Sequence, residues 1–360
     1  MKKLEKYFRV LDKSDWLIAF SLFIVLFTVV TASRLLRLNS TNAIETNNKK
    51  VIYLNQTSRL SDLIDNFQAK NISFDENELR WAANILGWKK FRSGRYELEG
   101  TYSYDILLSR LARGIQDPLT VTILPGITEE KFINDVSQKL KMDNDELSKV
   151  FNDSSLWAQE NIPTHLLMGR MLPNSYLVYW DIKSKNFIKR VLSEFKKKVV
   201  ITHRQRIDDL TYNLDELIVL ASIVEWEAKA NSEKKKIAGL YWNRLERGMK
   251  LQADPTINYA VGKRRRLLLK DYKIDHPYNT YLIRGLPPGP ITNPSYSSIE
   301  ATLYPEDHDY LFMVASPDDS KTHEFNTTYS EHLKASEKWR RWLRKQYRIK
   351  KQREASDSAS

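Results

Sequence analysis

The longest apolar run in the chain covers residues 16–33, WLIAFSLFIVLFTVVTAS, and contains no charged residue. A helix over this run spans about 27 Å, close to the thickness of the hydrocarbon core of a membrane. Five basic residues precede the run and only Arg34 and Arg37 follow it closely, so residues 1–15 are expected to stay in the cytoplasm. The run is too long for a typical signal-peptide core, and no convincing cleavage site follows it. We therefore predict a single-pass helix in the cytoplasmic (inner) membrane with the rest of the chain outside, in the periplasm; a cleaved signal peptide is the alternative.

The segment over residues 39–50, NSTNAIETNNKK, is polar and has no hydrophobic period, and residues 34–50 are predicted to be a linker. Residues 51–117 then alternate short strand-like and helical patterns, among them a helix near 76–86 and a helix over 104–113 that Gly114 ends. These patterns predict a small β/α module. Nothing in the module has catalytic spacing, which indicates a binding or spacer unit.

The longest patterned region covers residues 118–333. Residues 119–123 alternate as a strand does, whereas 128–140 and 145–151 have helical periods. Strands and helices are intermixed without a regular βαβ repeat, so the fold class is predicted to be α+β. A chain of 360 residues is long enough for this mixed α/β region to be a second domain with its own core.

The strongest helical pattern covers residues 213–228, NLDELIVLASIVEWEA. Asn213 and Glu216 have the spacing of a capping box at its start. The apolar positions recur at helical spacing and predict one buried stripe that ends at Glu225. Burial disfavours the charged form of a carboxyl group, so the pKa of Glu225 is expected to be raised, as a general acid requires; a structural salt bridge is the alternative. Glu227 lies about 200° further around the helix and is not expected to share this site.

Three segments after a predicted helix over residues 234–247 are rich in Pro, Gly, Asn, Thr and Tyr. They are residues 251–259 (LQADPTINY), 277–281 (PYNTY) and 285–294 (GLPPGPITNP). This composition predicts rigid loops with hydrogen-bonding and stacking side chains, which form a wall suited to a sugar polymer. Ordinary turn chemistry explains the same composition and is the alternative.

Composition and charge narrow the classes of function. The formal net charge of +12 favours an anionic partner such as a membrane surface, an acidic polymer or nucleic acid. The chain has no cysteine, which excludes disulfides, thiolate metal sites and a cysteine nucleophile. Its six histidines lack the close spacing of a zinc site. No metal and no cofactor is therefore expected.

The C-terminal segment is strongly basic. Residues 334–353 hold ten Lys or Arg and a single acid, Glu337. They predict a basic helix with an aromatic face, followed by a disordered tail over residues 354–360. Such a helix either touches an anionic surface or lies in solvent. A position outside the membrane counts against nucleic acid as its partner.

Several longer segments add a resemblance to this picture. Three segments follow one another along the chain: LASIVEWEA, AGLYWNRLERGMKLQADPTINYAVG and HPYNTYLIRGLPPGPITNPS. With these segments the chain strongly resembles the endolytic murein transglycosylases, the MltG or YceG-like family. The pieces GRYEL, LLSRLARG and ILPGIT extend the likeness to a LysM-like N-terminal module over residues 51–117. The resemblance implies a membrane-anchored endolytic lytic transglycosylase with a YceG-like catalytic domain over residues 118–333.

Such an enzyme cleaves the β-1,4 bond from N-acetylmuramic acid (MurNAc) to N-acetylglucosamine (GlcNAc) in nascent peptidoglycan. It leaves 1,6-anhydro-MurNAc ends and limits the length of the glycan strands. The implied partners are peptidoglycan glycan strands, inner-membrane lipid around the anchor and peptidoglycan synthases, with no nucleic acid.

By the same resemblance, Glu225 is the catalytic acid/base, because it occupies the first Glu of the family's ASIVE-x-E motif. A lytic transglycosylase needs one carboxyl group, where a hydrolase usually needs two. Glu225 protonates the glycosidic oxygen, and its carboxylate then takes the proton of the C6 hydroxyl, which closes the anhydro ring. The residues expected from the family motifs to bind substrate are Asn243, Arg244, Gln252, Asp254, Thr256, Tyr259, Tyr278, Asn279, Thr280, Tyr281 and His323.

Three of these residues have a second interpretation. Asp254 either stabilises the positive centre or caps a turn, and His323 either orients substrate or is a packed, hydrogen-bonded histidine. Arg244 either binds a substrate carboxylate or pairs with Glu246 or Asp254. The alternative function is a non-catalytic peptidoglycan-binding scaffold of the cell-wall synthesis machinery, against which the intact motif around Glu225 weighs. Departures from the family pattern that affect substrate contacts are Asn174, Ser175, Trp226, Ala228, His276 and Ser295.

Overall fold

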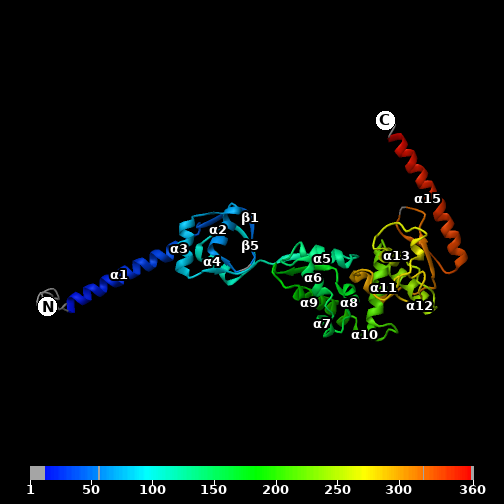
Figure 1. The fold of residues 1–360 in the computed structure, drawn as a ribbon, viewed down its shortest axis with the longest axis horizontal. Helices are drawn as coiled ribbons and strands as arrows, with labels where there is room; N and C mark the ends of the chain where they lie inside the picture. The colour runs from blue at the N-terminus through cyan, green and yellow to red at the C-terminus, as the bar shows by residue number, and fades with distance from the viewer. Residues whose placement is uncertain (1–12, 56, 319, 358–360) are drawn as a thin grey trace. The chain divides into compact units, whose positions relative to one another are not determined.

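The structure is a computed structural model that describes residues 13–55, 57–318 and 320–357. The chain divides into two compact units. Unit 1 comprises the residues up to Leu119 together with Tyr179–Asp181, and unit 2 comprises Thr120–Val178 and Ile182 onwards. Figure 1 shows their elements in chain order.

Helix α1, Lys13–Leu38, is longer than the predicted membrane helix over residues 16–33. Among the described residues it is the one helix long and apolar enough to cross a membrane, with a mean hydropathy of 2.3 over its most apolar stretch. Its last turn is attached to unit 1: Leu38 is buried in the core of that unit, and Arg37 forms an ion pair with Glu78 and lies over the Trp81 ring.

The prediction of a linker over residues 34–50 is wrong. Helix α1 covers the first part of that segment, and strand β1, Ile44–Leu54, covers the last part. β1 pairs with β5, Gly94–Tyr102, along most of its length, with an irregularity between Thr46 and Lys50. The central part of β1 is polar and exposed, so backbone pairing with a distant strand, rather than a hydrophobic period, makes it a strand.

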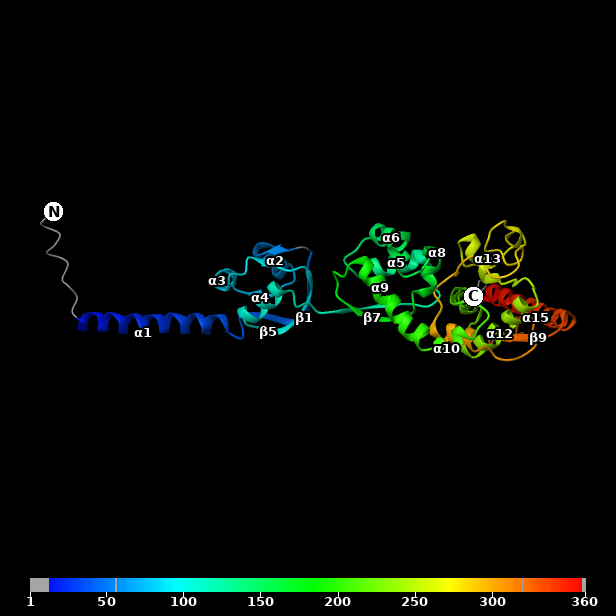
Figure 2. The same ribbon diagram turned by 90° about the horizontal axis from the view of Figure 1, so that it is seen from below.

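The rest of unit 1 packs against this sheet, whose strand order is β3-β1-β5. Figure 2 shows α2, α4, β1 and β5 within the unit. The helices α3 and α4 have the predicted bounds, and Gly114 ends α4 in a left-handed conformation with φ of 75°. The remaining elements are β2 Ser58–Arg59, α2 Leu60–Ala69, β3 Ser73–Phe74, α3 Glu76–Leu86, β4 Lys90–Phe91 and α4 Tyr104–Arg113.

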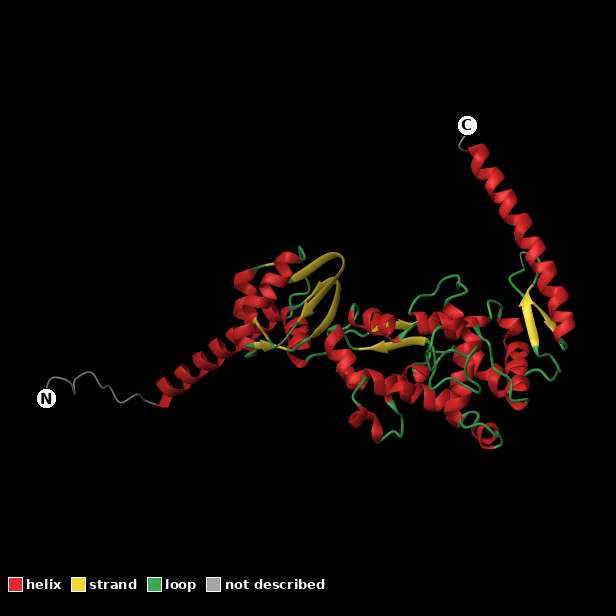
Figure 3. Cartoon of the chain, turned by 45° about the vertical axis from the view of Figure 1, so that its right-hand side comes forward, coloured by secondary structure: helices red, strands yellow, loops and turns green. Residues whose placement is uncertain are grey.

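Unit 2 is built mainly of helices and loops with two short strand pairs, β6-β7 and β8-β9. Figure 3 shows how little of it is strand. This mixture agrees with the predicted α+β class. Its first half contains β6 Leu119–Ile123, α5 Glu129–Ser137, α6 Asn144–Phe151, α7 Ser154–Ala158, α8 Thr164–Leu167, the 3-10 turn Met168–Arg170, β7 Asn174–Val178, α9 Ser184–Phe195, the π-helical segment Lys196–Ile201 and α10 Arg204–Asp208.

The centre of unit 2 is helix α11, Leu214–Glu227, whose start has the predicted capping box of Asn213 and Glu216. Every residue from Leu217 to Val224 is buried. The prediction of a single buried stripe is therefore wrong, because α11 packs against α14, α12 and α13. The later elements are the 3-10 turn Asn231–Glu233, α12 Lys234–Glu246, α13 Asp254–Val261, the 3-10 turn Asp271–Lys273, α14 Tyr296–Leu303, β8 Phe312–Ala315, β9 His323–Asn326 and α15 Tyr329–Asp357.

Two further expectations differ from the structure. The segment 251–259 was expected to be a loop, but most of it is the helix α13, which has Pro255 in its first turn. Pro is tolerated there because the first helical N–H groups have no partner within the helix. The basic C-terminal helix begins at Tyr329 rather than 334 and continues to Asp357, so it includes part of the predicted tail.

The first turns of α15 belong to the packed body of unit 2. Ala335 is buried, and the rings of His332 and Phe312 stack with their centroids 5.4 Å apart. The second half of α15 extends beyond the other elements of the unit (Figure 1). One helix therefore serves both as a wall of unit 2 and as an exposed basic extension.

Candidate active site

A groove of about 820 Å³ in unit 2 is lined by some of the residues predicted for the site and by others that the sequence did not single out. Its walls come from the C-terminal end of α11, from α12, from the start of α13, from β8 and β9, and from the first turns of α15. The sequence-predicted residues that line it are Arg244, Gln252, Asp254, Tyr281 and His323. The predicted residues that do not line it are Glu225, Asn243, Thr256, Tyr259, Tyr278, Asn279 and Thr280.

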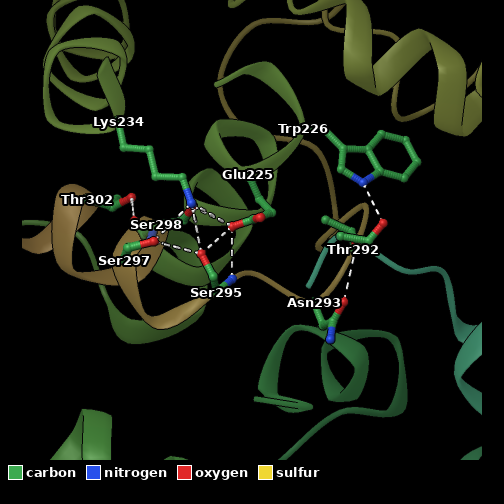
Figure 4. Close-up of polar contacts among 10 residues, drawn as sticks. Glu225, Trp226, Lys234, Thr292, Asn293, Ser295, Ser297, Ser298 and Thr302 are labelled. Atoms are coloured by element: carbon green, nitrogen blue, oxygen red, sulfur yellow. Dashed lines mark hydrogen bonds and ion pairs between the residues drawn. The ribbon is translucent and has the colours of Figure 1, made fainter. Parts of the chain in front are cut away.

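Glu225 lies outside the groove lining and is surrounded by donors. Its carboxylate accepts hydrogen bonds from the backbone N–H of Ser295 at 3.0 Å and from the Ser298 hydroxyl at 2.6 Å. The Ser295 hydroxyl also donates to it, and the Lys234 ammonium lies 3.2 Å away. Figure 4 shows these groups converging on Glu225, whereas the Trp226 indole points to the other side.

These donors overturn the expectation of a raised pKa. Burial raises the pKa of Glu225, but the hydrogen bonds from Ser295 and Ser298 and the charge of Lys234 together hold that pKa below its ordinary value. Lys234 begins α12, and Ser295 caps α14. The Glu225 carboxylate therefore joins three helices, which is the structural interpretation that the sequence left open.

Glu227, in contrast to Glu225, lines the groove. Burial and the negative charge of Asp254 raise the pKa of Glu227 to about 7, against the opposing effects of Tyr241 and Lys229. Its one hydrogen bond among the described residues comes from the Tyr241 hydroxyl at 3.3 Å. A carboxyl group with this pKa is partly protonated at neutral pH, as a general acid requires.

Sequence reasoning missed Glu227 because it assumed that α11 has one buried face. The 200° turn that separates Glu227 from Glu225 does place the two carboxyl groups on different sides of the helix. However, α11 is covered on all sides, so both of its faces meet protein. The second Glu of the E-x-E pair, at the end of a helix that is apolar almost all round, is the signal that could have found it.

Asp254 is the second acidic residue of the groove. It is the first residue of α13, and its carboxylate accepts hydrogen bonds from the Tyr281 hydroxyl at 2.6 Å and the Tyr272 hydroxyl at 3.4 Å. The N-cap of α13 is Ala253, so Asp254 does not cap that helix. Two phenols hold its carboxylate in the groove.

Arg244 lines the groove, but each of its three guanidinium nitrogens donates a hydrogen bond within the protein. Its guanidinium donates to the carbonyl oxygens of Lys250 and Leu311, each at 3.0 Å, and to the Gln252 side chain at 2.5 Å. Neither Glu246 nor Asp254 is its partner, so the predicted pairing is wrong. Arg244 fixes the position of Gln252, which adopts a left-handed φ of 52°.

The predicted loop residues mainly hold the loops together. Thr256 and Thr280 are fully buried, and their hydroxyl oxygens lie 2.9 Å apart. Asn279, also fully buried, donates to the carbonyl oxygens of Tyr272 and Ile274. These contacts make the rigid wall that composition predicted, with the bonding groups turned into the protein.

The other predicted residues divide between the same structural role and the groove. Asn243 donates to the carbonyl of His308 at 2.6 Å, and the rings of Tyr259 and Tyr278 pack with centroids 4.6 Å apart. His323 lines the groove, and its Nδ1 lies 3.0 Å from the carboxylate of the buried Glu233. His323 is therefore a hydrogen-bonded histidine that also faces the groove. Within the described parts of the chain, no three His, Cys, Asp or Glu residues are placed to hold a metal ion.

Comparisons with known proteins agree with the fold. The YceG-like family matches residues 52–338, so the chain belongs to this family. It is 30% identical over 315 residues to the endolytic murein transglycosylase of Bacillus subtilis (strain 168), a match that covers 82% of this chain and 87% of that relative.

A second relative is the endolytic murein transglycosylase of Streptococcus pneumoniae (strain ATCC BAA-255 / R6), which is 28% identical over 277 residues. That match covers 68% of this chain and 50% of the relative, so the chain spans about half of that longer protein. A YceG-like protein of Listeria monocytogenes with a solved crystal structure has a TM-score of 0.57 and 26% identity, over 80% of this chain and 99% of that one.

Proposed function

We propose that the chain is a membrane-anchored endolytic lytic transglycosylase. It cleaves the MurNAc–GlcNAc β-1,4 bond of nascent peptidoglycan and leaves 1,6-anhydro-MurNAc ends, which terminates elongation of the glycan strand. The observation that carries this proposal is a groove carboxyl group, Glu227, with a pKa of about 7, in a chain whose relatives are named endolytic murein transglycosylases.

We assign the acid to Glu227 and not to Glu225. An acid must give its proton at the pH of the reaction and must reach the substrate. Glu225 meets neither requirement, because its pKa lies below the ordinary value, Ser295, Ser298 and Lys234 all contact its Oε2, and it does not line the groove. Glu227 meets both.

The reaction follows from this assignment. Glu227 donates its proton to the glycosidic oxygen, the bond between that oxygen and C1 of MurNAc breaks, and positive charge develops at C1. The Asp254 carboxylate, held by the Tyr281 and Tyr272 hydroxyls, stabilises that charge. The Glu227 carboxylate then takes the proton of the C6 hydroxyl while O6 bonds to C1, so no water is consumed and the acid is regenerated.

Mass spectrometry of the digestion products tests this reaction. Purified full-length protein with uncross-linked glycan strands is expected to release anhydro-muropeptides, and the Glu227→Gln variant is expected to release them at a much lower rate. Products heavier by one water would identify a hydrolase, in which Asp254 acts as the second carboxyl group, and would overturn the proposal.

The membrane anchor supports the choice of a nascent strand as substrate. Helix α1 is long and apolar enough to hold the protein at the cytoplasmic membrane, with the basic N-terminal residues inside and both units outside. The proposed partners are then glycan strands, inner-membrane lipid and the peptidoglycan synthases that work at the same surface. A LysM-like role of unit 1 in strand binding belongs to the same proposal.

A further inference from the structure

The groove contains cations that the proposed reaction does not use. Besides Arg244, whose donors are bound within the protein, Lys229, Arg264 and Arg340 line it. None of these three forms an ion pair within the described residues. A groove for a neutral sugar polymer has no need of unpaired arginines.

Arg264 belongs to a loop whose shape is held by its neighbours. The next residue, Arg265, forms a bidentate ion pair with Asp271, with N–O distances of 2.7 and 2.9 Å. The Arg264 guanidinium carbon lies 5.0 Å from the ring centroid of Trp226, and the Trp226 indole is itself fixed by a hydrogen bond to the Gly126 carbonyl. Arg264 is thus positioned over an aromatic surface of the groove.

Arg340 belongs to helix α15, which is distant in sequence from the loop of Arg264 but contacts that loop. Arg266 of the loop donates to the Tyr347 hydroxyl of α15 at 2.8 Å. Ser336, Trp339 and Arg340 of the same helix line the groove. Arg340 donates to the Ser336 carbonyl through Nε alone among the described contacts, so its two terminal nitrogens are available to a ligand.

The match to the YceG-like family ends at residue 338, so Trp339 and Arg340 lie just beyond it. This part of the groove wall is therefore not accounted for by the family match. Arg264 over the Trp226 ring, and Arg340 next to Trp339 in the sequence, supply the groove with both charge and flat apolar surface. An arginine fork matches the geometry of a carboxylate, and a tryptophan ring packs against a sugar or an acyl group.

We propose that Arg264 and Arg340 form an anion subsite, at the α15 end of the groove, that binds a carboxylate of the glycan substrate. In peptidoglycan this carboxylate belongs either to the peptide attached to the MurNAc lactyl group or to the lactyl group itself where no peptide is attached. The proposal rests on the proposed function, because it takes peptidoglycan as the polymer in the groove. It restricts the substrate to strands that carry carboxylates.

The test uses the full-length protein in detergent micelles with three ligands. They are uncross-linked strands with their peptides, the same strands after an amidase has removed the peptides, and an uncharged chito-oligosaccharide as competitor. Arg264→Gln and Arg340→Gln are expected to raise KM about three- to tenfold with kcat unchanged, the size of effect expected for a partly exposed charge pair. Arg344→Gln, one turn further along α15 and outside the groove lining, is the matched control and is expected to change neither constant.

The same substitutions are made in the Glu227→Gln background, where Kd replaces KM. Weaker binding of peptide-bearing strands alone assigns the subsite to the peptide, and weaker binding of stripped strands assigns it to the lactyl carboxylate. Affinities equal to those of the Arg344→Gln control for both kinds of strand, or an equal loss for the chito-oligosaccharide, overturn the subsite. An absence of anhydro products from the unsubstituted protein instead overturns the proposed function, while the binding measurements still decide the subsite.

Discussion

Two glutamates, two residues apart on α11, have opposite chemistry because their surroundings differ. Glu225 accepts from two serines and from a lysine that is 6% exposed, so it is held as a carboxylate. Glu227 faces the negative charge of Asp254 and receives one long hydrogen bond from Tyr241. Equal side chains thus act as a structural anion and as a candidate acid, and the neighbours of each decide which.

The first prediction separates these two roles. Glu227→Gln is expected to lower the rate of anhydro-product formation by about 10²- to 10⁴-fold, the usual effect of losing a general acid, with thermal unfolding little changed. Glu225→Gln is expected to lower stability while the folded fraction keeps activity. Product formation per folded molecule, with the folded fraction taken from circular dichroism, measures both. An active Glu227→Gln variant and a folded, inactive Glu225→Gln variant would return the acid to Glu225.

The second prediction concerns pH. Glu227 must be protonated to act, so kcat/KM is expected to fall as the pH rises through about 7. Asp254 raises this pKa and the Tyr241 hydroxyl lowers it. Asp254→Asn is therefore expected to move the alkaline limb to lower pH, and Tyr241→Phe to move it to higher pH. A pH–rate profile of each variant measures the shift; limbs that stay in place in both variants contradict the assignment.

At the scale of elements, the end of α11 is positioned by other helices. The Glu225 carboxylate connects α11 to Lys234 at the start of α12 and to Ser295 at the cap of α14. Because Glu227 is two residues further along the same last turn, this connection also fixes where the groove acid lies. Helix α15 also shapes the groove, because its first turns form one of the groove walls.

The third prediction tests the connection between α11 and α12. Glu225→Ala leaves the Lys234 ammonium buried without its partner and is expected to cost about 3–5 kcal/mol of unfolding free energy. The double variant Glu225→Ala with Lys234→Met removes both charges and is expected to recover a large part of that loss. Urea denaturation of the single and double variants measures the difference. A single variant as stable as the unsubstituted protein would mean that this ion pair does not hold the helices together.

For the whole molecule, the apolar helix α1 and a large positive net charge belong to the same chain. The net charge of +12 includes groove cations such as Arg264 and Arg340 and the exposed half of α15. Leu38 and Arg37 at the end of helix α1 contact the rest of unit 1, so this apolar helix and the unit form one continuous structure. This arrangement suits an enzyme that meets an anionic polymer at a membrane.

The fourth prediction tests the anchor. Leu22 and Leu26 lie one turn apart on α1, with side chains 64% and 63% exposed. Replacing both with Arg is expected to release the protein from the membrane fraction, because each central Arg costs about 2.5–3.5 kcal/mol for membrane insertion. Replacing both with Ile is the control and is expected to leave the protein in the membrane. Carbonate extraction followed by immunoblotting distinguishes the two; retention of the Arg variant would argue against a spanning helix.

Local signals alone predicted several elements correctly. The capping box of Asn213 and Glu216, the bounds of α3 and α4, and the left-handed Gly114 all follow from residues within a few positions of one another. The polar strand β1 and the helix α13 were missed. β1 depends on its pairing with β5, whose paired residues lie between 40 (Leu54 with Gly94) and 58 (Ile44 with Tyr102) positions away, and the segment of α13 has the composition of a turn.

The sequence by itself determined the family-specific order of motifs, the apolar N-terminal helix and the segment that carries both glutamates. Only the tertiary structure decided which glutamate of that segment lines the groove and has a raised pKa. Ser295 and Ser298, which lower the pKa of Glu225, lie 70 and 73 positions away, and Asp254, which raises the pKa of Glu227, lies in another helix. The pKa of a carboxyl group depends on the charges and hydrogen-bond donors around it in space. Helical periodicity reports only the neighbours along one helix.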